Sequence, residues 1–326
     1  MTEAASNRSA LGIAFICAGM FSISINDMLT KQLSGGYPLH EIVFARSMIG
    51  VLFSFVIVQY EGGFSILKTD QPWLHAFRGL LVVISNFSYF VALAVMPLAD
   101  ATALFFAAPL FITVLSIPIL GERVGPLRMS AVAIGFGGVI LMQRPWEGSE
   151  TLEVDRLILL LPVLAAVTYA LLQLMTRKLG ATSAASAMAV YIQATFILVS
   201  LLFYLVAGDG RYAGVSDNAS VQFLLRPWIW PEAGDWPYFI GLGLNSAVIG
   251  YCLSAAYKAA DAATIAPFEY IGLPLAVFWG WLIWTDLPDW EVWVGMALIA
   301  GSGIFVFLRE KQKSRKIVRG EVRRRY

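Results

Sequence analysis

The sequence predicts an all-α integral membrane protein, and three observations carry that prediction. Of the 326 residues, 58% are hydrophobic and only 14% are charged, whereas soluble domains are about 25% charged. Apolar runs of about 20 residues, the length that crosses a bilayer as a helix, recur along the whole chain. Nearly all the connections between these runs are short.

Ten apolar segments are long enough to be candidate spans. No small-residue cleavage site ends the first of them, so we expect it to remain as a membrane span. The predicted segments are 10–30, 40–60, 75–95, 98–120, 126–143, 156–177, 184–207, 236–258, 263–285 and 290–308.

The polar segments predict how the chain lies in the membrane. The tail 309–326 carries nine Lys or Arg residues, and such segments stay on the cytoplasmic side. An even number of spans then places the N-terminal residues 1–9 inside too. The long connection 208–235 contains clustered Trp and Pro and is predicted to lie at the outer interface. We expect a multi-pass protein of the cell inner membrane.

The chain contains an internal repeat. LADATALFFAAP, from Leu98, has a counterpart in AADAATIAPFEYIGLP, from Ala259, and each is followed by a glycine-rich last span. The repeat divides the chain into 10–143 and 156–308, with five spans in each half. Because five is odd, the halves enter the membrane from opposite sides, which is the inverted repeat of many secondary transporters.

Three stretches have a further pattern in common with known proteins: FARSMIG in the second span, the run from FRGLLVV to FFAAPLF, and the block GERVGPLRMSAVAIGFGGVIL with its echo in the second half. They resemble the EamA family of the drug/metabolite transporter superfamily. The resemblance implies ten helices as two inverted five-helix repeats around a central cavity, and solute transport without ATP. The Asn-Asp and Lys of the first span are most similar to proposed riboflavin and S-adenosylmethionine carriers, while amino-acid or drug export is the alternative.

Glu269 is the clearest candidate for a functional ionisable group. It lies inside the ninth span next to Tyr270, where charge is costly and rarely faces lipid. The carboxyl group is suited to binding a cation or carrying a proton, or to a bond with a neighbouring helix. The prolines of the fourth and ninth spans are candidate hinges because each removes a helical hydrogen bond. They are Pro109, Pro118, Pro267 and Pro274.

A second set of candidates combines hydrogen-bonding and aromatic side chains within the spans. Together they favour a site for a polar or aromatic molecule, whereas each alone is equally suited to bonding neighbouring helices. They are Asn86, Tyr89, Phe90, Tyr169, Gln173, Asn245 and Tyr251.

Charged residues near the ends of spans have two interpretations. Asp27 and Lys31 are four residues apart in SINDMLTKQL, a spacing that suits an ion pair. Asp27 is equally a candidate for gating or substrate contact. Arg46 is expected to reach the interface by snorkelling. Asp100 is expected to cap the fourth span and to suit the positive end of its helix dipole.

The sequence has no recognisable apparatus for covalent, metal or ATP-dependent chemistry. HExxH, Gly-x-Ser-x-Gly and GxxxxGK[ST] motifs do not occur. We therefore expect no enzyme activity, no cofactor and no metal, with a membrane-embedded enzyme as the rival class. Net charge is +1, which indicates no nucleic-acid partner. The expected partners are a small metabolite and the bilayer, and the sequence leaves a homodimer and proton coupling open.

Overall fold

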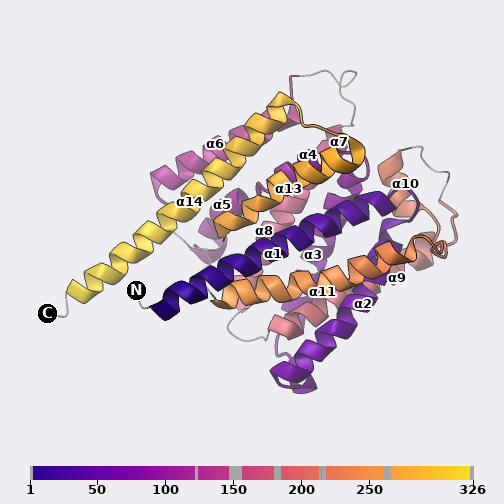
Figure 1. Ribbon diagram of the computed structural model, residues 1–326, viewed down its shortest axis with the longest axis horizontal. Helices are drawn as coiled ribbons and strands as arrows, with labels where there is room; N and C mark the ends of the chain where they lie inside the picture. Colours follow the sequence, from indigo (N-terminus) through magenta and orange to yellow (C-terminus); the bar gives the residue numbers. More distant parts are fainter. Residues whose placement is uncertain are drawn as a thin grey trace.

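The chain folds as a bundle of helices with both termini at the same end (Figure 1). The computed structural model describes residues 3–121, 124–146, 156–179, 185–212, 214, 218–259 and 266–323. Every regular element in these ranges is a helix, so the predicted all-α class is confirmed.

The helices follow the apolar segments, with short helical pieces between some of them. In chain order they are α1 (Glu3–Leu33), α2 (Leu39–Glu61), η1 (Phe64–Leu67), α3 (Pro72–Leu93), α4 (Leu98–Phe105), α5 (Ala108–Leu120), α6 (Pro126–Gln143), α7 (Arg156–Leu159), α8 (Leu161–Leu179), α9 (Ala185–Ala207), α10 (Ala219–Leu225), α11 (Trp236–Ala259), η2 (Ala266–Ile271), α13 (Gly272–Trp279), η3 (Gly280–Trp284) and α14 (Trp290–Arg323).

Eight of the helical segments in the described residues are long and apolar enough to cross a membrane. They coincide with the first seven predicted spans and the tenth. The eighth predicted span is the 24-residue helix α11. The ninth corresponds to the shorter apolar segment Phe268–Trp284, and its first predicted residues, including Asp261, lie outside the described residues. The protein is a multi-pass membrane protein.

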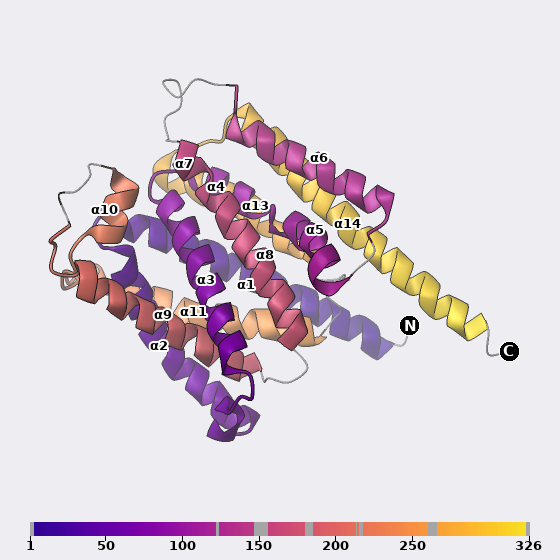
Figure 2. The same ribbon diagram turned by 180° about the vertical axis from the view of Figure 1, so that it is seen from behind.

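Helices far apart in the sequence pack side by side. α1 lies along α11, and α6 lies along α14, as both ribbon views show (Figures 1 and 2). Seen from behind, α3 lies against α8 (Figure 2). α2 packs between α9 and α11, and α4 packs against α13. Every one of these pairs joins the first half of the chain to the second half.

The fourth and ninth segments are not continuous α-helices. In the fourth, α4 ends at Phe105 and α5 begins at Ala108. Pro109 explains the break, because it has no N–H to give to the carbonyl four residues earlier and its ring would clash with that carbonyl. The ninth begins as the 3₁₀ helix η2, continues as α13 and ends in the π-helical turn η3.

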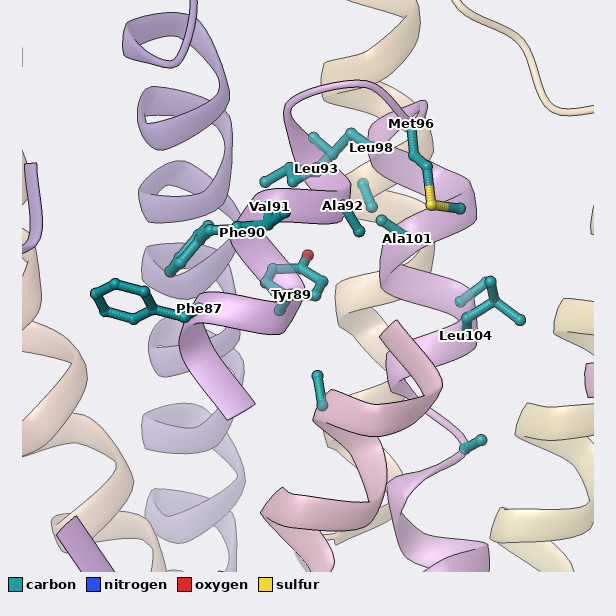
Figure 3. Packing of buried hydrophobic residues seen from close by; sticks show 14 of the residues in the cluster. Phe87, Tyr89, Phe90, Val91, Ala92, Leu93, Met96, Leu98, Ala101 and Leu104 are labelled. Carbon is teal, nitrogen blue, oxygen red and sulfur yellow. The ribbon is translucent and has the colours of Figure 1, made fainter. Parts of the chain in front are cut away.

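The turn between α3 and α4 contains part of the main hydrophobic core (Figure 3). Tyr89 points from α3 toward α4, whereas Phe87 and Phe90 project from the other side of α3. Leu98 and Leu104 on α4 are 1% exposed each. This packing holds the last turns of α3 against the first turns of α4.

Glycines bring α6 and α14 into close contact within one chain. A methyl group placed on Gly138 would lie 2.9 Å from the carbonyl oxygen of Gly295, so only glycine permits this approach. Gly301, in contrast, would meet nothing within 4 Å. It lines a shallow apolar hollow between α6 and α14.

The connection after α9 docks onto the end of the bundle where α1 ends, which we call the Lys31 end. Tyr37 donates a hydrogen bond to Oδ2 of Asp235 at 2.6 Å, and the Ile229 amide donates to Oε2 of Glu41 at 3.2 Å. Burial, and then the bond to Asp235, raises the pKa of Tyr37 above its ordinary value of 10. Tyr37 therefore keeps its proton and remains a donor at neutral pH.

Candidate functional site

A buried polar group lies where α1, α3 and α4 meet. The Tyr89 hydroxyl donates to Oδ2 of Asp27 at 3.1 Å, and Nδ2 of Asn26 donates to Oδ1 at 3.3 Å. The hydroxyl of Thr102, on α4, lies 2.9 Å from that of Tyr89. Asp27 and Tyr89, both predicted candidates, are thus brought into contact, while Thr102 was not singled out from the sequence.

Arg46 adds a positive charge to the same region. It is only 7% exposed, so the expectation that it snorkels to the interface is wrong. Its Nη2 donates to Oδ1 of Asn86 at 3.2 Å. The guanidinium carbon lies 5.7 Å from the ring of Phe90 and 5.5 Å from that of Phe196. Asp27 is close enough to interact with Arg46 electrostatically.

Arg46 points inward because of its position on a helix that is covered by two others. It lies seven residues after Leu39, the first residue of α2, or about 10 Å along the helix axis at about 1.5 Å per residue. Its guanidinium lies near the rings of Phe90 on α3 and Phe196 on α9, so this face of α2 points into the bundle. A charge at such depth avoids lipid when it turns toward the interior of the bundle.

Aromatic rings connect this polar group to the second half of the chain. Tyr89 lies 5.2 Å from Phe105, measured between ring centroids, and Phe105 lies 5.3 Å from Tyr169 on α8. Phe106 lies 5.5 Å from Tyr270. These separations are in the range that aromatic pairs prefer. We call the rings the aromatic cluster, which consists of Tyr89, Phe90, Phe105, Phe106, Tyr169 and Tyr270.

Glu269 lies at the other end of the aromatic cluster. It interacts electrostatically with the hydroxyl groups of Tyr169 and Tyr270. Gln173, one turn along α8 from Tyr169, is a hydrogen-bond partner of Tyr169. The structure therefore brings the predicted residues of the sixth and ninth spans together. The two carboxylates, Asp27 and Glu269, lie at opposite ends of a set of rings.

Two predicted residues lie outside this arrangement. Nδ2 of Asn245 donates to the backbone oxygen of Ser22 at 2.5 Å, a contact that joins α11 to α1. Tyr251 is 57% exposed and packs edge-on against Phe15, with 5.9 Å between ring centroids. In the described part of the chain, no hydrogen bond or ring contact joins either residue to the aromatic cluster.

The four predicted hinge prolines all lie in the interrupted segments. Pro109 follows the break between α4 and α5, and Pro118 lies inside α5. Pro267 falls in the 3₁₀ helix η2, and Pro274 lies near the start of α13.

Lys31 does not pair with Asp27. Its Nζ donates to the backbone oxygen of Met96, and it lies 5.2 Å from the ring of Trp284. It also interacts electrostatically with Asp286 and Asp100. The cap of α4 is Pro97, so the predicted N-cap role of Asp100 is wrong. Asp100 does lie in the first turn of α4, at the positive end of the helix dipole.

The sequence contained signals for three of the residues that were not predicted. Arg46 interrupts an apolar run, and a cation inside a span indicates an internal partner more often than contact with lipid. Phe105 and Phe106 directly precede the proline break in FFAAP. The break turns these adjacent rings toward different partners, Tyr169 and Tyr270.

Comparison with known proteins identifies the family. A model of the EamA-like transporter family matches residues 10–144. The chain is 30% identical to the riboflavin transporter of Rhizobium johnstonii over 95% of each chain. The chain belongs to the EamA-like transporter family. It is therefore a membrane transporter of the drug/metabolite transporter superfamily, as the resemblance implied.

Two further comparisons agree with this assignment. The chain is 27% identical to the S-adenosylmethionine uptake transporter of Rickettsia prowazekii, over 92% of this chain and 94% of that protein. A crystal structure of a protein with 21% identity matches with a TM-score of 0.62 and covers 94% of this chain. That match shows the same fold. The aromatic cluster and its charged neighbours thus belong to a transporter.

Proposed function

We propose that this EamA-like transporter is a secondary carrier that moves a small polar or aromatic organic metabolite by alternating access, without ATP. One observation carries the proposal. Asp27, Arg46 and Glu269 are ionisable groups within the apolar bundle, and rings from both halves of the chain connect them. Intramembrane ionisable groups are costly and commonly mark a solute or ion pathway.

The pairing of helices supports two inverted five-helix repeats. A two-fold axis that exchanges the halves makes α1 equivalent to α8, α2 to α9 and α3 to α11. The contact between α1 and α11 then requires an equivalent contact between α8 and α3. In the same way, the contact between α2 and α11 requires one between α9 and α3. Both contacts occur. The contacts α2–α9, α4–α13 and α6–α14 each join a segment to its own counterpart, as contacts on the axis must.

The arrangement at the Lys31 end supports a state closed on that side. Lys31 on α1 contacts Met96 between α3 and α4, and lies over Trp284 at the end of η3. Nearby, Nη2 of Arg144 lies 2.7 Å from Oδ2 of Asp289, and this pair joins the end of α6 to the start of α14. The contact of Lys31 with Trp284 and the ion pair of Arg144 with Asp289 both cross between the halves. They would separate when the site opens toward this end.

The interrupted segments provide the bending points in this mechanism. The segment formed by α4 and α5 packs against α8 and α13, and the segment formed by η2 and α13 packs against α1. Each segment departs from α-helical geometry at a proline. The aromatic cluster is closed by ring-to-ring contacts, so the central cavity of the proposal opens as these segments bend. The hinge residues are Pro109, Pro118, Pro267 and Pro274.

The topology we propose has both termini in the cytoplasm and the Lys31 end outside, in the cell inner membrane. The two termini lie at the same end of the bundle (Figure 1). The nine Lys and Arg residues of 309–326 favour the cytoplasmic side for that end. The connection 208–235 is then external, where exposed Trp230 suits the membrane interface.

The substrate we propose is a flat, polar metabolite of the riboflavin or S-adenosylmethionine kind, or an amino acid. Two relatives are named for transport of the first two compounds. Aromatic rings suit a planar group, and the tyrosines, Asn86 and Gln173 offer hydrogen bonds. We propose that Glu269 carries a proton or meets a cationic group of the solute. The carrier chemistry needs no cofactor, and we propose no catalytic step.

Exchange in proteoliposomes tests this function. Vesicles preloaded with unlabelled riboflavin, S-adenosylmethionine or an amino acid are placed in a trace of the labelled compound. A carrier accumulates label transiently only when its substrate is inside, whereas a channel does not. Chemically unaltered label distinguishes transport from the rival membrane enzyme. Absence of accelerated exchange for every compound would contradict the proposal.

A further inference from the structure

We propose that Arg46 is the specificity-determining residue of the site, and that its guanidinium binds a carboxylate of a zwitterionic solute. This inference rests on the proposed transport function and narrows its substrate class. The sequence had placed Arg46 at the membrane interface, and none of the predicted site residues is a cation.

The guanidinium has unused hydrogen-bonding capacity. An arginine side chain has five N–H donors. Among the described residues, Arg46 makes a single hydrogen bond, from Nη2 to Oδ1 of Asn86 at 3.2 Å. The rings of Phe90 and Phe196 lie near the guanidinium carbon but offer no lone pairs to its N–H groups. Four donors therefore have no acceptor in the described part of the chain.

The unused donors are not fully enclosed, and in the proposed mechanism a solute reaches them when the interrupted segments bend. Arg46 as a whole is 7% exposed. Its unbonded nitrogens, however, are not among the fully enclosed polar atoms of the described residues that lack a partner. These nitrogens therefore keep a small exposed area. A carboxylate fits such donors well because the planar guanidinium can bind both carboxylate oxygens at once.

The nearby charges indicate that the solute carries a cation as well. Asp27 balances Arg46 through space, since the two side chains form no ion pair within 4 Å. A solute carboxylate that binds Arg46 leaves Asp27 without a counter-charge in a poorly solvated site. Such an unpaired charge is costly, and a cationic group on the same solute removes the cost. Glu269 offers a second place for positive charge across the aromatic cluster.

The substrates named for the two relatives differ in whether they carry a carboxylate and a cation. S-adenosylmethionine has a carboxylate, an ammonium and a sulfonium group next to a flat adenine ring. Riboflavin has a flat ring but neither a carboxylate nor a cation. Arg46, Asp27 and the aromatic cluster together match the first set of groups.

The test compares S-adenosylmethionine with its decarboxylated analogue, which keeps the adenosyl, sulfonium and amine groups. Binding is measured by calorimetry on protein in nanodiscs for the wild type, Arg46→Gln and Arg46→Lys. The control is Arg78→Gln, which removes another buried arginine. Arg78 is 4% exposed and lies near the start of α3, about two turns before Asn86. We expect the wild type to bind S-adenosylmethionine about 10- to 100-fold more tightly than the decarboxylated analogue, the effect of a hydrogen-bonded ion pair.

The expected pattern in the variants is specific to a carboxylate contact. Arg46→Gln loses the preference because the carboxylate compound binds more weakly while the analogue does not. Arg46→Lys keeps part of the preference, and Arg78→Gln keeps all of it. If Arg46→Gln does not fold, Arg46→Lys alone decides, because an undiminished preference in that variant overturns the inference.

Other outcomes separate this inference from the proposed function. If the protein exchanges riboflavin, and Arg46→Gln discriminates between the paired compounds as the wild type does, the inference is overturned while transport stands. Equal weakening of both compounds in Arg46→Gln also overturns it, since that indicates a purely structural role. If no compound is bound or exchanged, both proposals fail together.

Discussion

The hydroxyl of Tyr89 donates to Oδ2 of Asp27 at 3.1 Å, and this bond joins α3 to α1 within the membrane. A phenol has one proton, so Thr102, 2.9 Å away, must be the donor in its contact with Tyr89. The hydroxyl groups thus form a chain that runs from α4 to the carboxylate. These bonds hold the Asp27 carboxylate in a fixed position within the site. The ion pair with Lys31 that the sequence spacing suggested does not form.

The first prediction concerns Asp27. Asp27→Asn removes the charge that balances Arg46, and we expect exchange in proteoliposomes to fall at least about tenfold, as for the loss of a charge-assisted contact. Tyr89→Phe should have a smaller effect because it removes only one donor to Asp27. The folded fraction is checked by size-exclusion chromatography. Normal exchange by Asp27→Asn in both directions would show that SINDMLTKQL is only an anchor.

Glu269 is the subject of the second prediction. Glu269→Gln keeps the shape and hydrogen-bonding capacity of the side chain but cannot carry a proton or a charge. We expect a folded protein whose transport is abolished or no longer depends on pH, measured as flux across a range of external pH. Asp209→Asn is the control, since Asp209 is an exposed carboxylate bonded to Arg211 in the connection after α9. Wild-type flux and wild-type pH dependence in Glu269→Gln would count against a role in transport.

Part of this arrangement could be predicted from the sequence, and part could not. Asp27, Tyr89, Tyr169 and Glu269 stand out because polar groups are rare in apolar runs, and the structure places all four around one set of rings. Sequence spacing describes only neighbours along one helix. It could not show that Lys31 reaches Met96, because that contact depends on the packing of α1 against the turn before α4.

Asn245 and Arg46 are two further cases that the sequence could not decide. Asn245 was predicted to belong to the site and lies outside the aromatic cluster, whereas Arg46 was not predicted and lies beside it. Asn245 had the same pattern as the site residues, yet its amide bonds the backbone of Ser22 on a neighbouring helix. Arg46 is close enough in the sequence to the end of its span to reach water, yet its guanidinium lies between rings of α3 and α9. Helix packing, which one sequence does not specify, decides both cases.

The third prediction tests closure at the Lys31 end. Lys31→Met keeps the length of the side chain but removes the bond to Met96 and the contact of its charge with Trp284. We expect this end to open more often. The measurement is labelling of Thr102→Cys by a membrane-impermeant maleimide, after Cys17 and Cys252 have been replaced. Thr102 is 5% exposed, so labelling reports opening.

Lys68→Met is the matched control for that experiment, because Lys68 lies in the connection between α2 and α3. Labelling should be faster in Lys31→Met than in Lys68→Met. Equal rates would mean that Lys31 does not help to close this end.

A fourth prediction concerns packing beside the site. A methyl group on Gly303 would overlap the hydroxyl of Tyr270, whereas one on Gly301 meets nothing within 4 Å. Gly303→Ala should therefore lower stability by about 1–3 kcal/mol, the usual cost of overpacking, and Gly301→Ala should not. Thermal unfolding in detergent measures both. Tyr270→Phe should partly rescue Gly303→Ala, and a failure to rescue would place the clash elsewhere.

The central claim is that the site within the bundle binds and moves an organic solute. It is tested most directly by counterflow in proteoliposomes with S-adenosylmethionine, riboflavin and amino acids, comparing the wild type with Asp27→Asn. The account predicts that the wild type transiently concentrates at least one labelled compound and that Asp27→Asn does so at least about tenfold more slowly. Counterflow of equal rate in both proteins, or none for any compound, would contradict it.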